Sequence, residues 1–145
     1  MLDHVNLPVS DLERSRRFYE QALTALDCKF VLQDGSAIGF GRDSWSFGIV
    51  LASTPLPRIH VAFAARDREQ VDRFYRAALA AGGVPNGSPG IRSEYDPNYY
   101  AAFVLDPDGH NVEAVCRHGP RSPGLGCDEG TGLVRSGVKP TLTIR

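Results

Sequence analysis

Three residues that lie far apart in the sequence carry side chains that bind divalent metals in proteins: His4, His60 and Glu113. The two histidines occupy the same place in two similar segments, and Glu113 interrupts the apolar, strand-like run NVEAV. Two imidazoles and one carboxylate are a known ligand set for divalent iron, manganese, zinc, nickel or cobalt, with coordination positions left open for substrate or water. We therefore expect His4, His60 and Glu113 to bind one divalent metal ion, whose identity the sequence leaves open.

The two histidines belong to a segment that occurs twice in the chain. Residues 3–23 (DHVNLPVSDLERSRRFYEQAL) match residues 59–79 (IHVAFAARDREQVDRFYRAAL) at a constant offset of 56 residues, the separation of His4 and His60. The other identical pairs include Asp11 and Asp67, Arg17 and Arg73, and the dipeptides Phe18-Tyr19 and Phe74-Tyr75. Because one register is kept over about twenty residues, the match indicates a duplicated supersecondary unit.

Each copy has the pattern of a strand followed by a helix. Apolar residues alternate at its start, and capping-box spacings at residues 10–13 (SDLE) and 67–70 (DREQ) indicate where the helices begin. The second helix should end at Gly82-Gly83, where a left-handed cap causes glycine no side-chain strain. Short strand-like runs separated by turn residues follow each helix: KFVLQ, AIGFGR and SFGIVLA in the first half, and GVPN, YYAAFVL and NVEAVC in the second.

The elements predict an α+β fold made of two tandem βαβββ modules, at about residues 1–54 and 58–117. We expect the modules to form a single domain with a cupped mixed sheet and with helices on its outer face. Residues 118–145 form a glycine- and proline-rich tail with little periodicity, which is not expected to have a core of its own.

Alternation along the strands indicates which way the three ligand-type residues point. His4, His60 and Glu113 each lie beside apolar residues that suit the helix-covered side, so their own side chains should face the inner surface of the cup. For Glu113 alone, the alternative is an ordinary solvent-exposed position on a strand. His110 and His118 have no partner in the repeat, and we expect both to be exposed to solvent rather than to bind metal.

Composition excludes several kinds of partner. The 16 basic and 17 acidic residues give a formal net charge of -1, so no basic stripe is available for nucleic acid. No apolar stretch approaches the roughly 20 residues that span a bilayer, and the N-terminus lacks the pattern of a secretory signal, so we expect a cytoplasmic protein without membrane contact. Three widely separated cysteines, Cys28, Cys116 and Cys127, are expected to be free thiols.

The doubled βαβββ unit, the histidine in the first strand of each half and the segment FVLDPDGHNVEAV together resemble the vicinal oxygen chelate superfamily. This superfamily includes glyoxalases, extradiol dioxygenases, fosfomycin-resistance thiol transferases and bleomycin-resistance proteins. The resemblance covers about residues 2–117. It implies a cupped sheet that holds one divalent metal, to which a small substrate binds through its oxygens, and a metal that acts as a Lewis acid. It also implies a homodimer whose modules pair across the interface.

Some residues of this sequence differ from those of individual families in the superfamily. These differences disfavour some reactions but do not identify the reaction. The segment SFGIVLA has no acid where glyoxalase I has a fourth metal ligand, and Phe103 stands where ring-cleaving dioxygenases have a tyrosine. Fosfomycin-resistance transferases share the three-ligand pattern and need cationic contacts to a phosphonate. Arg92 and Ser93 lie in a comparable stretch here, but no lysine accompanies them. The leading expectation is a glyoxalase-like lyase or isomerase. The alternatives are a non-catalytic ligand-binding protein of the bleomycin-resistance kind and a thiol transferase with a thiol cosubstrate.

Several side chains are candidates for contact with a small-molecule substrate, although no catalytic base can be identified. Arg92 and the tyrosines of the following loop precede the penultimate strand, and loops often carry binding residues. Trp45 and Phe47 either line the wall of the first half or fill its core. The predicted substrate contacts are Arg92, Tyr95, Tyr100, Phe47 and Phe103, with Tyr99 as a further candidate on the same loop.

Overall fold

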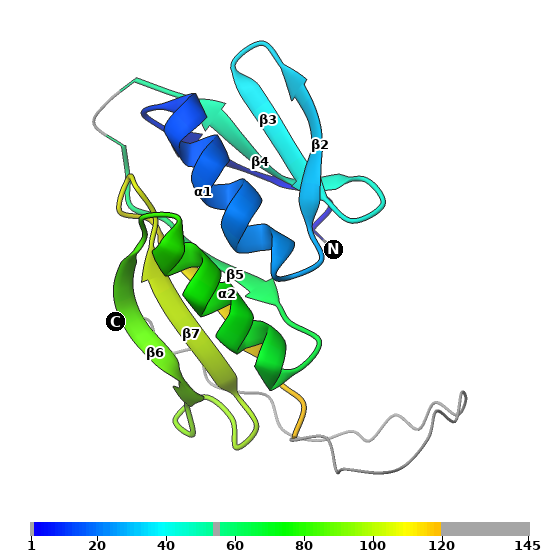
Figure 1. Ribbon diagram of the computed structural model, residues 1–145, viewed down its shortest axis with the longest axis vertical. Helices are drawn as coiled ribbons and strands as arrows, with labels where there is room; N and C mark the ends of the chain where they lie inside the picture. Colours follow the sequence, from blue (N-terminus) through cyan, green and yellow to red (C-terminus); the bar gives the residue numbers. More distant parts are fainter. Residues whose placement is uncertain (1, 54–55, 120–145) are drawn as a thin grey trace.

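The computed structural model describes residues 2–53 and 56–119, and it confirms the two βαβββ modules predicted from the sequence (Figure 1). The first module contains β1 (Val5–Val9), α1 (Leu12–Thr24), β2 (Lys29–Asp34), β3 (Ala37–Gly41) and β4 (Trp45–Leu51). The second contains β5 (His60–Ala64), α2 (Arg68–Ala80), β6 (Val84–Ile91), β7 (Tyr100–Leu105) and β8 (Asn111–Cys116). The predicted tail and Cys127 lie outside the described residues, apart from His118 and Gly119.

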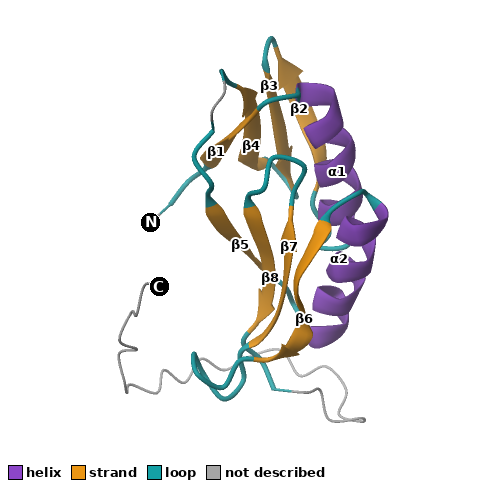
Figure 2. Cartoon of the chain, turned by 90° about the vertical axis from the view of Figure 1, so that its left-hand side faces the viewer, coloured by secondary structure: helices purple, strands orange, loops and turns teal. Residues whose placement is uncertain are grey.

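Each module forms one mixed four-stranded sheet within the described residues. The strand orders are β1-β4-β3-β2 and β5-β8-β7-β6, in which β1 pairs with β4 and β5 pairs with β8 in parallel, and the other pairs are antiparallel. Both helices lie on the same side of the two sheets (Figure 2). We call the faces turned away from the helices the open faces. No helix of the described part is long and apolar enough to cross a membrane.

The helix boundaries follow from capping residues. The Asp67 carboxylate accepts a hydrogen bond of 2.8 Å from the backbone N–H of Gln70, and Gly82 ends α2 with a φ of +93°, as the sequence predicted. The capping box predicted to begin at Ser10 was wrong by one residue, because α1 is capped by Asp11. The Ser10 hydroxyl instead donates a hydrogen bond to Asp108 in the other module.

A single apolar core fills the space between the sheets and the helices. The two modules meet in it through an edge-to-face contact between the rings of Phe47 and Phe63, whose centroids are 5.0 Å apart. Aromatic pairs of this kind add to the stabilisation that burial of their apolar area provides. The large, fully buried core side chains are Leu7, Val9, Phe18, Tyr19, Leu23, Ile38, Phe40, Ile49 and Phe74.

The turn between β7 and β8 is held by Asp106, whose carboxylate is almost fully buried. One of its oxygens accepts the backbone N–H groups of Asp108 at 2.9 Å and His110 at 2.8 Å, and the other accepts the hydroxyl of Tyr19 at 2.7 Å. Burial and the neighbouring Asp106 carboxylate raise the pKa of Tyr19 well above its usual range, so Tyr19 stays a donor. The turn that starts β8 is therefore tied to α1.

His110 joins the two modules, and the prediction that it is exposed was wrong. Its side chain is fully buried; Nδ1 accepts the backbone N–H of Ile59 at 3.2 Å, and Nε2 donates to the carbonyl of Pro8 at 2.8 Å. One ring nitrogen must accept while the other donates, so the imidazole is neutral in this arrangement. His118 is exposed, as expected.

Candidate metal centre

Glu113 lies in the middle of the second sheet and points to its open face. In the strand register it is opposite Ala62 on β5 and Phe103 on β7, while its neighbours Val112 and Ala114 point into the core. Side chains of adjacent strand residues leave opposite faces of a sheet. The alternation argument therefore placed Glu113 on the correct face.

The Glu113 carboxylate is nevertheless buried, with only 2% of its surface exposed, so the alternative of an exposed strand position is wrong. Its Oε2 atom lies 2.8 Å from Nε2 of His60, and its Oε1 atom accepts a hydrogen bond of 2.6 Å from the hydroxyl of Tyr99. A buried charge destabilises the fold unless it is paired and hydrogen-bonded, and Glu113 is both. An imidazole nitrogen and a carboxylate oxygen thus converge on the open face, an arrangement that fits a borderline divalent cation.

Tyr99 is the residue of this centre whose role the sequence did not reveal. Burial, followed by the hydrogen bond to Glu113 and the charge of that carboxylate, raises the pKa of Tyr99. The hydroxyl therefore stays protonated and donates a hydrogen bond to Oε1, which leaves Oε2 facing His60. Tyr99 was a candidate for substrate contact, and only the pairing of β7 with β8 shows that it reaches Glu113.

His4 lies at a different place in this chain. Its Nδ1 atom is 2.7 Å from the Asp3 carboxylate, and its ring centroid is 4.5 Å from that of Trp45 on the first sheet. The structure therefore brings together His60 and Glu113 of the three predicted ligands, while His4 contacts other residues. Its side chain is 45% exposed, so it is accessible from outside the chain.

A second group of acidic and histidine side chains occurs at the turn between β7 and β8, where the two modules meet. Within residues 2–53 and 56–119, the one set of three such residues with ligand atoms within 4.8 Å of one another is Asp106, Asp108 and His110. The hydrogen bonds of Asp106 and His110 described above already use their oxygens and ring nitrogens, and Asp108 accepts from Ser10 and Arg14. A metal here would have to break the bonds that join the modules, so we assign this group to the fold.

The first sheet has no counterpart of Glu113. Because β1 pairs with β4 as β5 pairs with β8, the equivalent of Glu113 is Gly48, opposite Asn6. The Asn6 side-chain oxygen occupies the space that a Cβ atom at Gly48 would need. Residues 46–52 therefore lack an acid, and the Asn6 side chain fills the space where the side chain of such an acid would lie.

The predicted substrate contacts fall into two groups. Phe103 lies beside Glu113, the guanidinium carbon of Arg92 is 5.5 Å from the centroid of the Phe103 ring, and Tyr95 packs its ring on Tyr99 at 5.1 Å. Two residues lie on the helix side of the sheets instead. Phe47 is 2% exposed in the core, and the Tyr100 hydroxyl donates a hydrogen bond of 2.8 Å to Asp72 of α2.

Replacing Tyr99 with phenylalanine should lower the affinity for Mn²⁺ by about tenfold, because Glu113 loses the donor that orients it and outer groups of this kind typically contribute 10–100-fold. Titration of the purified protein with Mn²⁺, followed calorimetrically, measures the change. Tyr95→Phe is the matched control, since Tyr95 meets Tyr99 through its ring, and it should leave the affinity unchanged. Equal affinity of the Tyr99→Phe variant and wild type would show that Tyr99 does not position Glu113.

Comparison with known proteins agrees with this architecture. The family model described as "Glyoxalase/Bleomycin resistance protein/Dioxygenase superfamily" matches residues 1–114. The protein YqjT of Bacillus subtilis, described as uncharacterized, is 32% identical, with the match covering 79% of this chain and 97% of YqjT. A crystal structure of a glyoxalase/bleomycin resistance protein from Albidiferax ferrireducens is 31% identical, with a TM-score of 0.69 and coverage of 79% and 97%. The fosfomycin resistance protein FosX from Mesorhizobium loti has a TM-score of 0.60 at 23% identity, covering 80% of this chain and 91% of FosX, and shows the shared fold alone.

Proposed function

Because this chain belongs to the glyoxalase/bleomycin resistance protein/dioxygenase superfamily, we propose that it is a metal-dependent, glyoxalase-like enzyme of the lyase or isomerase type. Its substrate is a small molecule that approaches the metal through oxygen atoms. The observation that carries the proposal is the buried Glu113 carboxylate, which faces Nε2 of His60 on the open face of the second sheet. A half-exposed imidazole nitrogen and a buried carboxylate oxygen on one open face are two of the ligand types that a divalent metal site uses.

The residues of the second module have distinct parts in this site. His60 presents Nε2 and Glu113 presents Oε2 to the same point, and the Tyr99 hydroxyl keeps Oε1 occupied. A divalent metal bound there would supply Lewis acidity, which stabilises negative charge on a bound oxygen. Phe103 forms the apolar wall beside the two ligands, with its ring centroid 6.2 Å from that of His60.

We further propose that the third ligand, His4, comes from a second copy of the chain. His4 has the register of His60 in the repeat, and its half-exposed ring is separate from the His60–Glu113 pair of its own chain. In a twofold dimer, the open face of the first module of one copy can lie against the second module of the other, and symmetry then completes two identical sites. This arrangement uses all three predicted ligands.

Metal analysis of protein purified without an affinity tag tests the proposed function. After incubation with Mn²⁺, Fe²⁺, Co²⁺, Ni²⁺ or Zn²⁺ and removal of excess metal, one of these ions should be bound per chain. The proposed enzyme would be contradicted if none of the five were retained, and a metal-free ligand-binding protein of the bleomycin-resistance kind would then be favoured. Light scattering on the same sample should give the mass of a dimer.

Mixing two defective variants should restore metal sites if the ligands come from both copies. His4→Ala and Glu113→Gln variants should each bind little metal, but a mixed dimer has one intact site, formed by His4 of one copy and the His60 and Glu113 of the other. After equal amounts are unfolded together and refolded, metal content should reach about a quarter of the wild-type value, since about half of the dimers are mixed. No recovery would show that each site lies within one chain. Refolded wild type serves as the reference for yield.

A further inference from the structure

We propose that the substrate of this site carries a carboxylate group, held by Arg92 and Arg117, at the end opposite to the oxygens that face His60 and Glu113. The inference rests on the proposed function, because it names the chemical class of substrate for the same open face. It adds Arg117, which the sequence did not indicate, and it gives Arg92 a specific partner.

Arg92 is held over the open face by contacts that leave its charge free. Its guanidinium stacks on Phe103, the strand neighbour of Glu113, and donates one hydrogen bond of 2.7 Å to the neutral carbonyl of Ser88. Glycines on β6 make room for it: a Cβ at Gly90 would lie 3.1 Å from one guanidinium nitrogen, and one at Gly87 would lie 2.8 Å from the Phe103 ring. Strand β6 thus carries glycine where Arg92 and Phe103 have to pack.

Arg117 lies over the ring of Tyr99. It lies four residues after Glu113 at the end of β8, and its guanidinium carbon is 4.7 Å from the centroid of the Tyr99 ring. Tyr99 is joined to Arg92 through the backbone, since its carbonyl accepts the Arg92 N–H at 2.7 Å. Tyr99 thus contacts Arg117 through its ring and Glu113 through its hydroxyl, and it links this guanidinium to a candidate metal ligand.

Arg92 reaches Phe103 beside the ligand pair, whereas Arg117 lies further along the sheet. The row of strand partners between Glu113 and Arg117 consists of Ala64, Val115, Ala101 and Gly90. At about 3.3 Å per residue, the backbone distance from Glu113 to Arg117 is about 13 Å, which the long arginine side chain shortens. Ala101 is fully buried and the Tyr99 hydroxyl reaches across this row to Glu113, so the proposed substrate lies against Tyr99, with a few carbon atoms between its metal-facing oxygens and its carboxylate.

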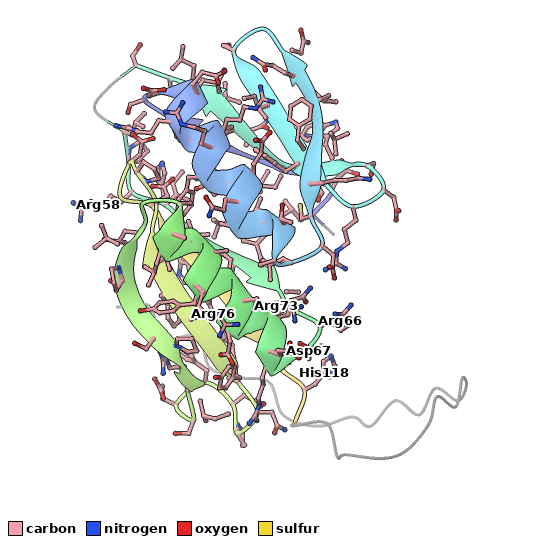
Figure 3. The ribbon with its side chains drawn as sticks, in the orientation of Figure 1. Arg58, Arg66, Asp67, Arg73, Arg76 and His118 are labelled. Carbon is pink, nitrogen blue, oxygen red and sulfur yellow. The ribbon has the colours of Figure 1, made fainter. Side chains whose placement is uncertain are left out.

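The balance of charge calls for an anion here. Within residues 2–53 and 56–119, the arginines in ion pairs are Arg14, Arg16, Arg66 and Arg73, so neither Arg92 nor Arg117 is neutralised by a carboxylate of the described chain. Arg66, Arg73 and Asp67 belong to the helix side of the molecule (Figure 3). Glu113 offers one negative charge against two arginines and a divalent ion. A guanidinium binds a carboxylate through two parallel hydrogen bonds, so a carboxylate suits this pair of arginines.

Calorimetric binding of 2-oxoglutarate and of its 5-methyl ester tests the proposal. Both probes present the same 2-oxo acid end to the metal, and they differ only in the charge at the far end. With Mn²⁺ present, 2-oxoglutarate should bind about tenfold or more tightly than the ester, as expected for a charge-assisted hydrogen-bonded pair. Arg92→Gln and Arg117→Gln should each weaken 2-oxoglutarate binding by about tenfold while leaving ester binding within about twofold.

The control variant is Arg76→Gln, because Arg76 lies on α2 at the helix side (Figure 3) and should not affect either probe. The proposal is overturned if 2-oxoglutarate does not bind, if the ester binds equally well, or if both arginine variants bind 2-oxoglutarate as wild type does. The same titrations are repeated without metal, where the arginines should still favour 2-oxoglutarate over the ester. A sample that binds no Mn²⁺ but keeps this arginine-dependent preference would overturn the metal proposal alone.

Discussion

Replacing Glu113 with glutamine is expected to lower the affinity for Mn²⁺ by about a hundredfold or more, with the fold retained. Glutamine has the same shape and still accepts the Tyr99 hydroxyl, but its amide oxygen carries no negative charge for a cation. The effect exceeds that of Tyr99→Phe, because a ligand is lost rather than a residue that orients one. Metal titration by calorimetry and circular dichroism of the same samples measure affinity and fold separately.

Glu69→Gln is the matched control for this variant. Glu69 has the same side chain, but it lies on α2, is 77% exposed and pairs with Arg73 at 3.0 Å. Its replacement should leave metal affinity unchanged, because an exposed ion pair contributes little to the fold and nothing to the site. If Glu113→Gln bound Mn²⁺ as tightly as wild type, the metal centre would have to be sought elsewhere in the protein.

Replacing Asp106 with alanine is expected to destabilise the protein by about 3 kcal/mol, the largest effect on stability that we predict. The substitution removes the acceptor of the Tyr19 hydroxyl and of two backbone N–H groups, those of Asp108 and His110. Because these donors lie in or beside the buried junction between the modules, they are left without their partner away from water. Urea unfolding followed by circular dichroism gives the difference in the free energy of unfolding.

Comparing Asp106→Ala with a helix-cap variant separates the loss of the buried Asp106 carboxylate from the loss of an exposed hydrogen bond. Asp11→Ala removes an exposed carboxylate that caps α1 and should destabilise by only about 1 kcal/mol. Adding Tyr19→Phe to each variant completes a double-mutant cycle, in which Asp106 and Tyr19 should be coupled and Asp11 and Tyr19 should be additive. Below the unfolding transition, Asp106→Ala should still bind Mn²⁺. Loss of metal by this folded variant would instead support a cation at the turn.

Local patterns in the sequence were sufficient for much of the architecture. The repeat predicted both βαβββ modules, the strand alternation placed His60 and Glu113 on the face away from the core, and Gly82 marked the end of α2. These features depend on periodicity, on backbone conformation and on hydrogen bonds within a few residues. Residues close together in the sequence determine all three. The choice of Asp11 over Ser10 as the cap depended on a distant partner, Asp108, and was missed.

The tertiary structure alone decided which distant groups meet. Tyr99 reaches Glu113 while Tyr100 donates to Asp72 on the opposite side, because a shift of one residue along a strand reverses the face to which a side chain points. His110 is buried because its two ring nitrogens satisfy backbone groups of both modules, although its place in a turn suggested exposure. The sequence by itself determined the candidate ligands and the strands that carry His60 and Glu113. The pairing of β5 with β8 in the second module brings His60 and Glu113 together, while His4 lies apart on the first module. Contacts between segments remote in the chain depend on register and docking rather than on any local pattern.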